Sequence, residues 1–389
     1  MSDISIVGWS HSEFGKCFDD DIESLITGVA SSAIEKTGID PAEIDGVFIG
    51  NFNNGLSRQN FPSSLPMQSI PELNMKPAVR CENACASGSA AVYAARDFIA
   101  AKRGRFALVI GVEKMTGLST AQVGDVLLGA SYCEEEHDIQ GGFAGLFGTI
   151  AQSYFQKYGD QSDALAMIAA KNHKNGVDNP YAQMRRDFGF DFCRNVSEKN
   201  PYVAAPLKRT DCSLISDGAA AIVITDEQTA ETMPNAARFR AAVQVNDYLP
   251  LSKRDPTYLA GAARAWSSAL DQAGLSLNDL DFIETHDCFT IAELLEYEAM
   301  GLTPRGQGAI AALEGWTAPD GRMPVNRSGG LKAKGHPIGA TGVSMLAITA
   351  MQLAGEAGDM QLPKADIAGV FNMGGVAVAN YVSILERQN

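Results

Sequence analysis

The hydrophobic pattern of the chain alternates between helical and strand-like stretches. Apolar spacing predicts a helix over Ile22 to Lys36, and a strand-like run follows it through Gly46-Val-Phe-Ile-Gly50. Good helix formers predict a second helix from Ser89 to Lys102, and Arg105 to Gly111 reads as a buried strand bounded by glycine. Such alternation favours mixed β-sheets covered by helices.

Part of this pattern occurs twice. The residue pattern from Gly38 to Asp45 recurs from Gly274 to Asp281. Each copy follows a predicted helical segment and precedes a predicted strand. Each half then continues through a glycine-rich turn, an Ala-rich helix and a buried strand, over Cys85 to Gly111 and over Gly335 to Phe371. We therefore expect two similar α/β halves that bury helices between their sheets.

A segment of weaker periodicity interrupts the first half. It extends from Thr116 to Ser213. We expect this segment either to shape the access of substrate to the site or to make a structural or subunit contact. The predicted organisation is an N-terminal half at 1–115 and 214–235, an inserted loop domain at 116–213, and a C-terminal half at 236–389.

Composition narrows the class of protein. The chain has 389 residues and a net charge of −15, which argues against sequence-independent binding to nucleic acid or to an anionic membrane. Neither a signal peptide nor an apolar run long enough to cross a bilayer is present. The 7 cysteines are odd in number and scattered, so neither a disulfide framework nor a zinc site is indicated. We expect a cytoplasmic protein with reduced thiols and without a partner membrane or nucleic acid.

Cys85 lies where a polar turn leads into the second predicted helix. Unpaired backbone N–H groups and the positive end of the helix dipole favour a thiolate at such a position, which makes Cys85 a candidate nucleophile. The alternative is a small buried hydrophobic residue, the commoner role of a lone cysteine in an Ala-rich helix. Position alone leaves both roles open.

Two histidines stand at comparable boundaries. His286 and Cys288 follow the repeated strand, where a turn could aim both side chains at one cavity, whereas the alternative is that Asp287 or Thr290 simply caps the next helix. His336 precedes a proline in a glycine-rich run that opens another helix, and this fixes its backbone for acid–base work.

Glycines mark the last candidate stretch. Gly374 ends a strand, where its backbone N–H could contribute to an oxyanion hole, and the alternative is an ordinary hairpin turn. The glycine-rich run around His336 lacks the Walker spacing, so we do not expect a nucleotide-hydrolysing P-loop.

Three motifs together resemble the thiolase superfamily in order and spacing: Asn83-Ala-Cys-Ala-Ser-Gly88, His286-Asp-Cys-Phe289 and Gly335-His-Pro-Ile-Gly-Ala-Thr-Gly342. The middle motif resembles the sterol carrier protein 2 type, and Asn372 stands where most thiolases carry a late cysteine. The resemblance implies the α/β thiolase fold, in which two βαβαβαββ halves stack as five layers (αβαβα) with an inserted loop domain.

The same resemblance implies an acyl-CoA acyltransferase that makes or cleaves 3-ketoacyl-CoA through an acyl-cysteine. Cys85 would be the nucleophile, His336 its activating base, and Cys288 the acid/base at the α-carbon. His336 and His286 would form one oxyanion hole, and the backbone N–H groups of Cys85 and Gly374 would form the other.

Partners follow from that chemistry. Acyl-CoA and coenzyme A would be substrates, and neither a resident cofactor nor a metal is implied. Family likeness implies a homodimer or homotetramer. Two alternatives stay open: transfer to a non-CoA acceptor with the help of a small accessory subunit, and a catalytically silent thiolase-like binding subunit. Basic residues that could meet the phosphates of coenzyme A, or simply form a solvated basic surface, are Lys208, Arg209, Lys253, Arg254, Lys332 and Lys334.

Overall fold

A computed structural model describes residues 4–17 and 19–388. The first half of the fold ends only at residue 226, because a long segment is inserted before its last strand. Its elements are β1 (Ile4–His11), α1 (Ile22–Thr37), β2 (Ile44–Gly50), β3 (Ala78–Cys81), α2 (Ser87–Ala100), β4 (Phe106–Glu113) and β7 (Gly218–Asp226).

The second half repeats this order with extra helices. A short helix, α8 (Glu227–Ala230), links the halves. The elements that follow are β8 (Ala237–Asn246), α9 (Ala260–Ala273), β9 (Phe282–Glu284), α10 (Thr290–Ala299), α11 (Gly308–Leu313), α12 (Gly330–Lys334), α13 (Ile338–Leu353), β10 (Ile367–Gly374) and β11 (Ala379–Arg387).

Strand order confirms the predicted duplication. The large sheet has the strand order β3-β2-β4-β7-β1-β8-β11-β10-β9. Counted outward from the β1–β8 junction, the strands of the two halves follow in the same order, β1-β7-β4-β2 on one side and β8-β11-β10-β9 on the other. That junction is short, with Ser5 opposite Arg238 and Ile6 opposite Ala237. The counterpart of β3 is reduced to one parallel bridge between Ile283 and Val325. Two copies of one strand pattern therefore meet edge to edge.

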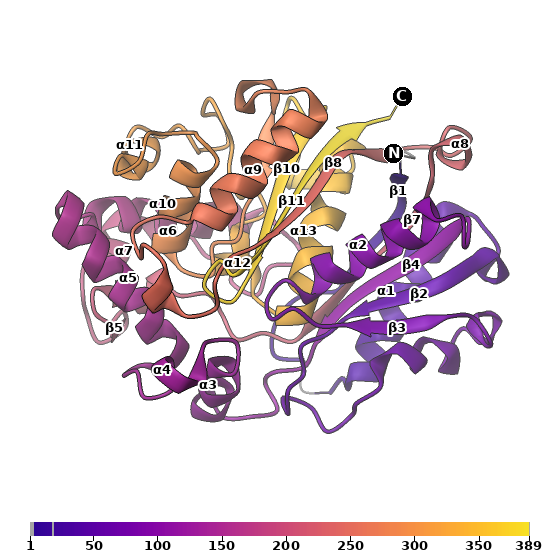
Figure 1. Ribbon diagram of the computed structural model, residues 1–389, viewed down its shortest axis with the longest axis horizontal. Coiled ribbons are helices and arrows are strands. Elements are labelled where there is room, and N and C mark those ends of the chain that lie inside the picture. The colour runs from indigo at the N-terminus through magenta and orange to yellow at the C-terminus, as the bar shows by residue number, and fades with distance from the viewer. Residues whose placement is uncertain (1–3, 18, 389) are drawn as a thin grey trace.

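Helices lie in three layers around the two parts of the sheet, as Figure 1 shows. α1 packs on β1, β4 and β7, and α9 packs on β8 and β11, whereas α2 and α13 contact each other between the two parts. All 16 residues of α13 are buried, while α1 buries one face only. A helix that is apolar all round belongs inside a protein, so the sequences of these helices match their layers.

Two glycine contacts bring the central helices close together. A Cβ at Gly88 of α2 would lie 2.8 Å from the carbonyl oxygen of Gly339, and a Cβ at Gly342 of α13 would lie 2.4 Å from the backbone nitrogen of Ser89. Side chains at either position would push the helices apart. Glycines in the motif around His336 thus serve helix packing, and the residues just ahead of α2 and α13 become neighbours.

Between β4 and β7 the chain forms a mainly helical excursion. Its elements are α3 (Thr120–Leu128), α4 (Cys133–Glu136), α5 (Gly142–Tyr158), α6 (Ser162–Val177), α7 (Gly189–Arg194), β5 (Tyr202–Ala204) and β6 (Leu207–Lys208). α6 packs on α10, α11 and α12 of the second half. The excursion therefore contacts the elements that carry the candidate histidines.

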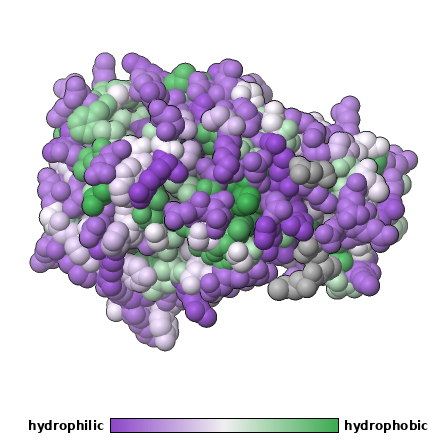
Figure 2. Space-filling model, turned by 90° about the horizontal axis from the view of Figure 1, so that it is seen from above, coloured by the Kyte–Doolittle hydropathy of each residue, from purple (hydrophilic) through white to green (hydrophobic). Residues whose placement is uncertain are grey.

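The surface is mostly polar on the face seen from above. Figure 2 shows a face on which hydrophilic residues predominate, with small hydrophobic areas between them. Within the described residues, every helix is too short or too polar to cross a bilayer.

Candidate active site

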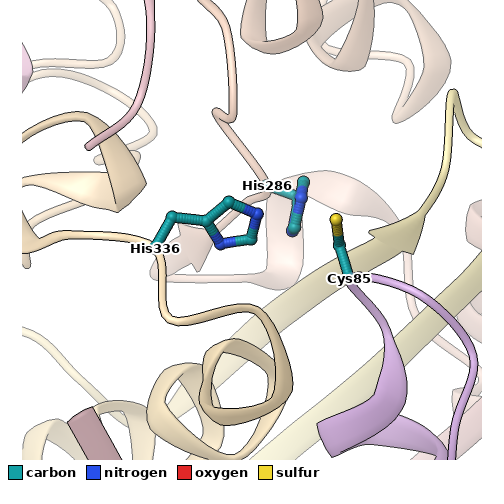
Figure 3. A group of neighbouring side chains, drawn as sticks. All are labelled: Cys85, His286 and His336. Atoms are coloured by element: carbon teal, nitrogen blue, oxygen red, sulfur yellow. The ribbon is translucent and has the colours of Figure 1, made fainter. Parts of the chain in front are cut away.

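Three of the predicted site residues converge from three separate segments. Cys85 precedes α2, His286 follows β9 and His336 precedes α13, and Figure 3 shows their side chains around one common space. The sulfur and one ring nitrogen of each histidine all lie within 4.8 Å of one another. The two rings are nearly perpendicular, with centroids 5.0 Å apart. Residues more than 200 positions apart in sequence thus form one cluster.

Cys85 is buried and held by a strained turn. Ala84 before it has a φ of 50°. The helix α2 begins at Ser87, whereas the sequence predicted a start at Ser89, so Cys85 lies two residues before the helix. Burial raises the pKa of Cys85 to about 12, although a backbone N–H of Gly375 opposes this shift. The helix N-terminus alone therefore does not hold Cys85 as a thiolate, which corrects the expectation from sequence. A base is needed.

His336 is oriented on both sides by hydroxyl groups. Its backbone N–H donates to Ser216 Oγ at 3.1 Å, and its Nδ1 lies 2.7 Å from Thr341 Oγ1. The Thr341 hydroxyl donates its proton to the carbonyl oxygen of Pro337 at 3.0 Å, so it must accept from His336 Nδ1–H. Burial, with help from Lys334, lowers the pKa of His336 to about 3. The ring is neutral, and its Nε2 is free to accept a proton.

His286 has the opposite arrangement. Its Nδ1 lies 2.9 Å from the side-chain nitrogen of Asn372, while its Nε2 is buried and has no hydrogen-bond partner among the described residues. Burial lowers its pKa well below the usual range, and His336 and Lys334 add to this effect. Sequence reasoning placed Asn372 at the position of a missing cysteine but assigned it no role. Only its distance from His286 reveals one.

Cys288 completes the predicted set. It is buried, its backbone N–H donates to His286 O at 2.9 Å, and its own carbonyl accepts from Ser213 N at 2.9 Å. Burial raises the pKa of the Cys288 thiol well above its ordinary value, with a smaller contribution from Cys85. These two backbone hydrogen bonds fix Cys288 in the turn that follows His286.

Asp287 anchors the turn between His286 and Cys288. Neither Asp287 nor Thr290 caps α10, whose first-turn cap residue is Phe289, so the alternative suggested by sequence is wrong. Asp287 instead accepts hydrogen bonds from the backbone of α12, including Leu331 N at 2.6 Å. Burial raises its pKa to about 7. The turn is thus fixed to the helix that precedes His336.

Gly374 also meets the nucleophile loop. A Cβ at this position would lie 2.3 Å from the carbonyl oxygen of Asn83, so the end of β10 reaches the loop only because residue 374 is glycine. A cavity of about 730 Å³ is bordered there by Asn83, Ala84 and Gly374. Gly374 also ends the strand just before the turn that joins the antiparallel strands β10 and β11, as the hairpin alternative predicted, and the oxyanion-hole role of its N–H stays a prediction.

The basic candidates divide into two groups. Lys208, Lys332 and Lys334 are buried, and they pair respectively with Asp211, the Cys212 carbonyl and Ser344. They are not the solvated basic surface that we considered, and their side chains hold the site together from inside. Of the remaining three, Arg254 is half-buried and donates to Val376 O, whereas Arg209 and Lys253 are exposed.

The same thiol and two imidazoles are the group of side chains within the described chain that could hold a metal ion. Zinc favours such sulfur and nitrogen ligands. The prediction of a metal-free site stays a prediction.

A duplicated α/β fold with a buried cysteine beside two neutral histidines defines a class of enzymes that form covalent cysteine intermediates. The profile described as Thiolase, N-terminal domain matches residues 4–188, and that described as Thiolase C-terminal domain-like matches residues 243–387. The chain belongs to the thiolase family, as its motifs predicted.

Relatives and structures agree with this assignment. The chain is 35% identical, over all of both proteins, to an acetyl-CoA acetyltransferase of Methanothermobacter thermautotrophicus. It is 33% identical to sterol carrier protein 2 of Homo sapiens, over 89% of this chain and 63% of that protein. A solved Ltp2-ChsH2(DUF35) aldolase has the same fold, with a TM-score of 0.83 at 19% identity over 99% of this chain and 98% of that one. The predicted thiolase fold is confirmed.

Proposed function

We propose that this protein is a thiolase-type acyl-CoA acyltransferase that makes or cleaves 3-ketoacyl-CoA through an acyl-Cys85 intermediate. The observation that carries the proposal is the meeting of the Cys85 thiol with the His286 and His336 rings within 4.8 Å. Full-length similarity to an acetyl-CoA acetyltransferase supports it. Coenzyme A thioesters are the substrates, and the reaction needs no resident cofactor.

Cleavage begins with proton transfer from Cys85 to His336 Nε2. The thiolate attacks the 3-keto carbon, and the backbone N–H groups of Cys85 and Gly374 stabilise the resulting oxyanion. The C2–C3 bond then breaks, which leaves an acyl group on Cys85 and an enolate of acetyl-CoA. The raised pKa of Cys85 explains why this step requires a base.

The second half of the cycle restores every proton. Cys288 protonates the enolate carbon, while N–H donors of His286 and protonated His336 stabilise the enolate oxygen. Coenzyme A then gives its thiol proton to the Cys288 thiolate and attacks the acyl group. Cys85 leaves as a thiolate and takes its proton back from His336. Condensation follows the same path in reverse.

Intact-protein mass spectrometry tests the proposal. Purified protein is incubated briefly with acetyl-CoA or with acetoacetyl-CoA, and any adduct is located by peptide mapping. We expect an acetyl group on Cys85 from both substrates, and release of acetyl-CoA when coenzyme A is added. An adduct from acetyl-CoA alone would support transfer to another acceptor. No adduct from acetyl, butyryl or longer acyl-CoA would refute the acyl-enzyme.

Charge distinguishes two pockets that could receive the phosphates of coenzyme A. One, of about 650 Å³, is lined by three acidic residues, Glu135, Glu136 and Asp138, and by one basic residue, Arg254. The other, of about 360 Å³, carries only basic charges among its described lining residues, which include Arg186, Lys199, Arg209 and Lys332, and it adds Phe188 and Phe192. In a protein of net charge −15, such a basic pocket favours an anion. Aromatic rings there suit a stacked base.

Two hydrogen bonds link the wall of the basic pocket to the turn that carries Cys288. Lys332 in its wall donates to the carbonyl of Cys212, and the next residue, Ser213, hydrogen-bonds the backbone of Cys288. We therefore propose that the nucleotide end of coenzyme A binds there. Charge reversal by Arg209→Glu should raise KM for the thioester by about 10-fold, because a charge-assisted hydrogen bond contributes ~1.5–3 kcal/mol. Reversal at the exposed Arg103, outside the pocket, is the matched control, and equal effects of the two variants would contradict the assignment.

Assembly and location complete the proposal. β3 is an edge strand with one neighbour, and Phe61, Met75 and Val79 near it are 71%, 92% and 44% exposed. Exposed apolar edges favour pairing with another chain, which supports a homodimer or homotetramer. Light scattering of the purified protein tests this. All seven cysteines are free, in keeping with a cytoplasmic location, which cell fractionation would check.

A further inference from the structure

The side chain of Asn372 connects the nucleophile segment to one catalytic-site histidine. It is buried on β10, and its hydrogen-bond partners are all distant from it in sequence. Its nitrogen lies 3.2 Å from the carbonyl oxygen of Cys85 and 2.9 Å from His286 Nδ1, and its oxygen accepts from Ser89 Oγ at 2.7 Å. Three groups therefore meet at one amide, two from the segment around Cys85 and one from the turn that carries His286.

These contacts fix which way the amide points. A carbonyl oxygen can only accept a hydrogen bond, so the group facing Cys85 O must be the NH₂ of Asn372. The Ser89 hydroxyl donates to the opposite end. An amide NH₂ has two protons, one for Cys85 O and one for His286 Nδ1. A reversed amide would set two carbonyl oxygens against each other.

The amide in turn fixes the tautomer of His286. A ring nitrogen that accepts a hydrogen bond carries no proton, so the neutral ring must hold its single proton on Nε2. This Nε2 is the buried atom that lacks a partner among the described residues. It belongs to the cluster shown in Figure 3, beside Cys85 and His336. His286 is thus set to donate.

His336 is set in the other sense. Thr341 takes the proton of His336 Nδ1, so the Nε2 of that ring accepts in the resting protein. Two chemically identical rings, with centroids 5.0 Å apart, therefore present one donor and one acceptor to the same space. Neither tautomer can be read from the histidines themselves.

We infer that Asn372 is a positioning residue that locks His286 in the Nε2–H tautomer, so that His286 donates to the thioester oxygen of the substrate that loses its α-proton. This inference rests on the proposed thiolase function. The same amide steadies the Cys85 backbone, but its effect on the carbon–carbon step is the larger one, because that step needs the His286 donor.

Replacement by aspartate reverses the polarity without changing the shape. In Asn372→Asp, a carboxylate faces Nδ1, which must then carry the proton, and Nε2 of the neutral ring loses its own. Exchange of the acetyl-CoA α-protons in D₂O should fall ~10²–10³-fold, the usual cost of losing one oxyanion donor. Acetylation of Cys85 should fall less than α-proton exchange does. The carboxylate loses the hydrogen bond to Cys85 O, but the proposed oxyanion hole for this step is made of backbone N–H groups that the substitution leaves in place.

A matched control separates tautomer from packing. Ser89→Ala removes the hydrogen bond to the Asn372 oxygen but leaves both NH₂ contacts, so α-proton exchange should stay within about 10-fold of wild type. Thermal unfolding of each variant shows whether it folds. Should Asn372→Asp not fold, Asn372→Ala replaces it, and this variant removes the donor without imposing the other tautomer. Equal losses in exchange and acetylation would overturn the inference.

Nitrogen NMR gives a readout independent of activity. The sequence has only 5 histidines, so ¹⁵N-histidine protein yields few signals, and His286→Gln identifies the pair of interest. We expect a protonated Nε2 and an unprotonated Nδ1 in wild type, and the reverse in Asn372→Asp. A protonated Nδ1 in wild type would overturn the inference. A protein that forms no acyl-Cys85 would instead refute the proposed function, while the NMR result would still test the tautomer.

Discussion

The two halves of the molecule share a strand order but place different chemistry at the same position. In each half a loop leads into a central helix, and this loop carries Cys85 in the first half and His336 in the second. Because α2 and α13 pack directly on each other, these two loops become neighbours. Duplication thus gives two equivalent positions, and the residues there differ, as the proposed roles of nucleophile and base require.

A second contrast concerns the two buried thiols. Burial raises the pKa of both Cys85 and Cys288, so neither is a thiolate in the resting protein. Cys85 lies beside His336, which can take its proton, whereas Cys288 lies in a turn that Asp287 anchors to α12. The roles that we propose for the two thiols, nucleophile and acid/base, therefore differ because their neighbours differ.

The largest effect should follow loss of the first thiol. Cys85→Ser should lower acetoacetyl-CoA thiolysis by up to ~10⁶-fold, the scale seen when an enzyme loses its nucleophile. No acetyl adduct should form at residue 85. The exposed Cys133 is the matched control, and Cys133→Ser should retain wild-type rates. Trapping of labelled acetyl at another residue in the Cys85 variant would contradict the assignment.

The second thiol should show a different loss. Cys288→Ala should keep acetylation of Cys85 close to wild type but slow carbon–carbon bond formation by ~10²–10⁴-fold, the range for a missing general acid or base. Burst-phase acetylation and steady-state condensation are measured on the same preparation. Full condensation activity would show that the two thiols do not divide the work in this way.

Substitution of glycine should change the free energy of unfolding in opposite directions in the central helix layer, which holds α13, and in the outer layer, which holds α1. Gly342→Ala in α13 would bring a Cβ within 2.4 Å of Ser89 N, so we expect a loss of ~1–3 kcal/mol in the free energy of unfolding. Gly28 lies on the exposed face of α1, where no atom lies within 4 Å of a new Cβ. Gly28→Ala should stabilise the protein by ~0.5–1 kcal/mol. Denaturant unfolding measures both, and the same sign for the two variants would contradict the layer assignment.

A last comparison tests whether the inserted segment unfolds together with the two halves. His173 on α6 is buried without a hydrogen-bond partner in the described chain, and burial lowers its pKa from 6.5 to about 2. Between these values the unfolded chain binds a proton that the folded one does not, so stability falls as pH falls below 6.5.

Removal of that ring tests the coupling. Between pH 6 and pH 4, His173→Leu should lose less stability than wild type, by up to ~1.4 kcal/mol per pH unit. His137→Leu, at an exposed position, is the control and should keep the wild-type slope. Denaturant unfolding at several pH values provides the comparison. Equal slopes in wild type and His173→Leu would show that α6 opens separately from the rest.

Local pattern in the sequence determined most of the elements. The predicted helix at 22–36 matches α1 within one residue, because its apolar spacing depends only on neighbours along the chain. The three motifs were sufficient to name Cys85, His286, Cys288 and His336. The structure brings the sulfur of Cys85 and one ring nitrogen of each histidine within 4.8 Å of one another, and the role of Cys288 stays a prediction. Reaction type and family followed from the motifs alone.

Tertiary structure decided what depends on distant partners. The roles of Asn372 and Thr341, the burial of Lys332 and Lys334, and the raised pKa of Cys85 all arise from side chains that meet only after the two halves pack. Desolvation and hydrogen-bond direction depend on the three-dimensional surroundings of an atom, and sequence spacing does not encode them. The sequence by itself therefore determined which reactive groups the protein has, and the packing of its two halves determined their protonation and direction.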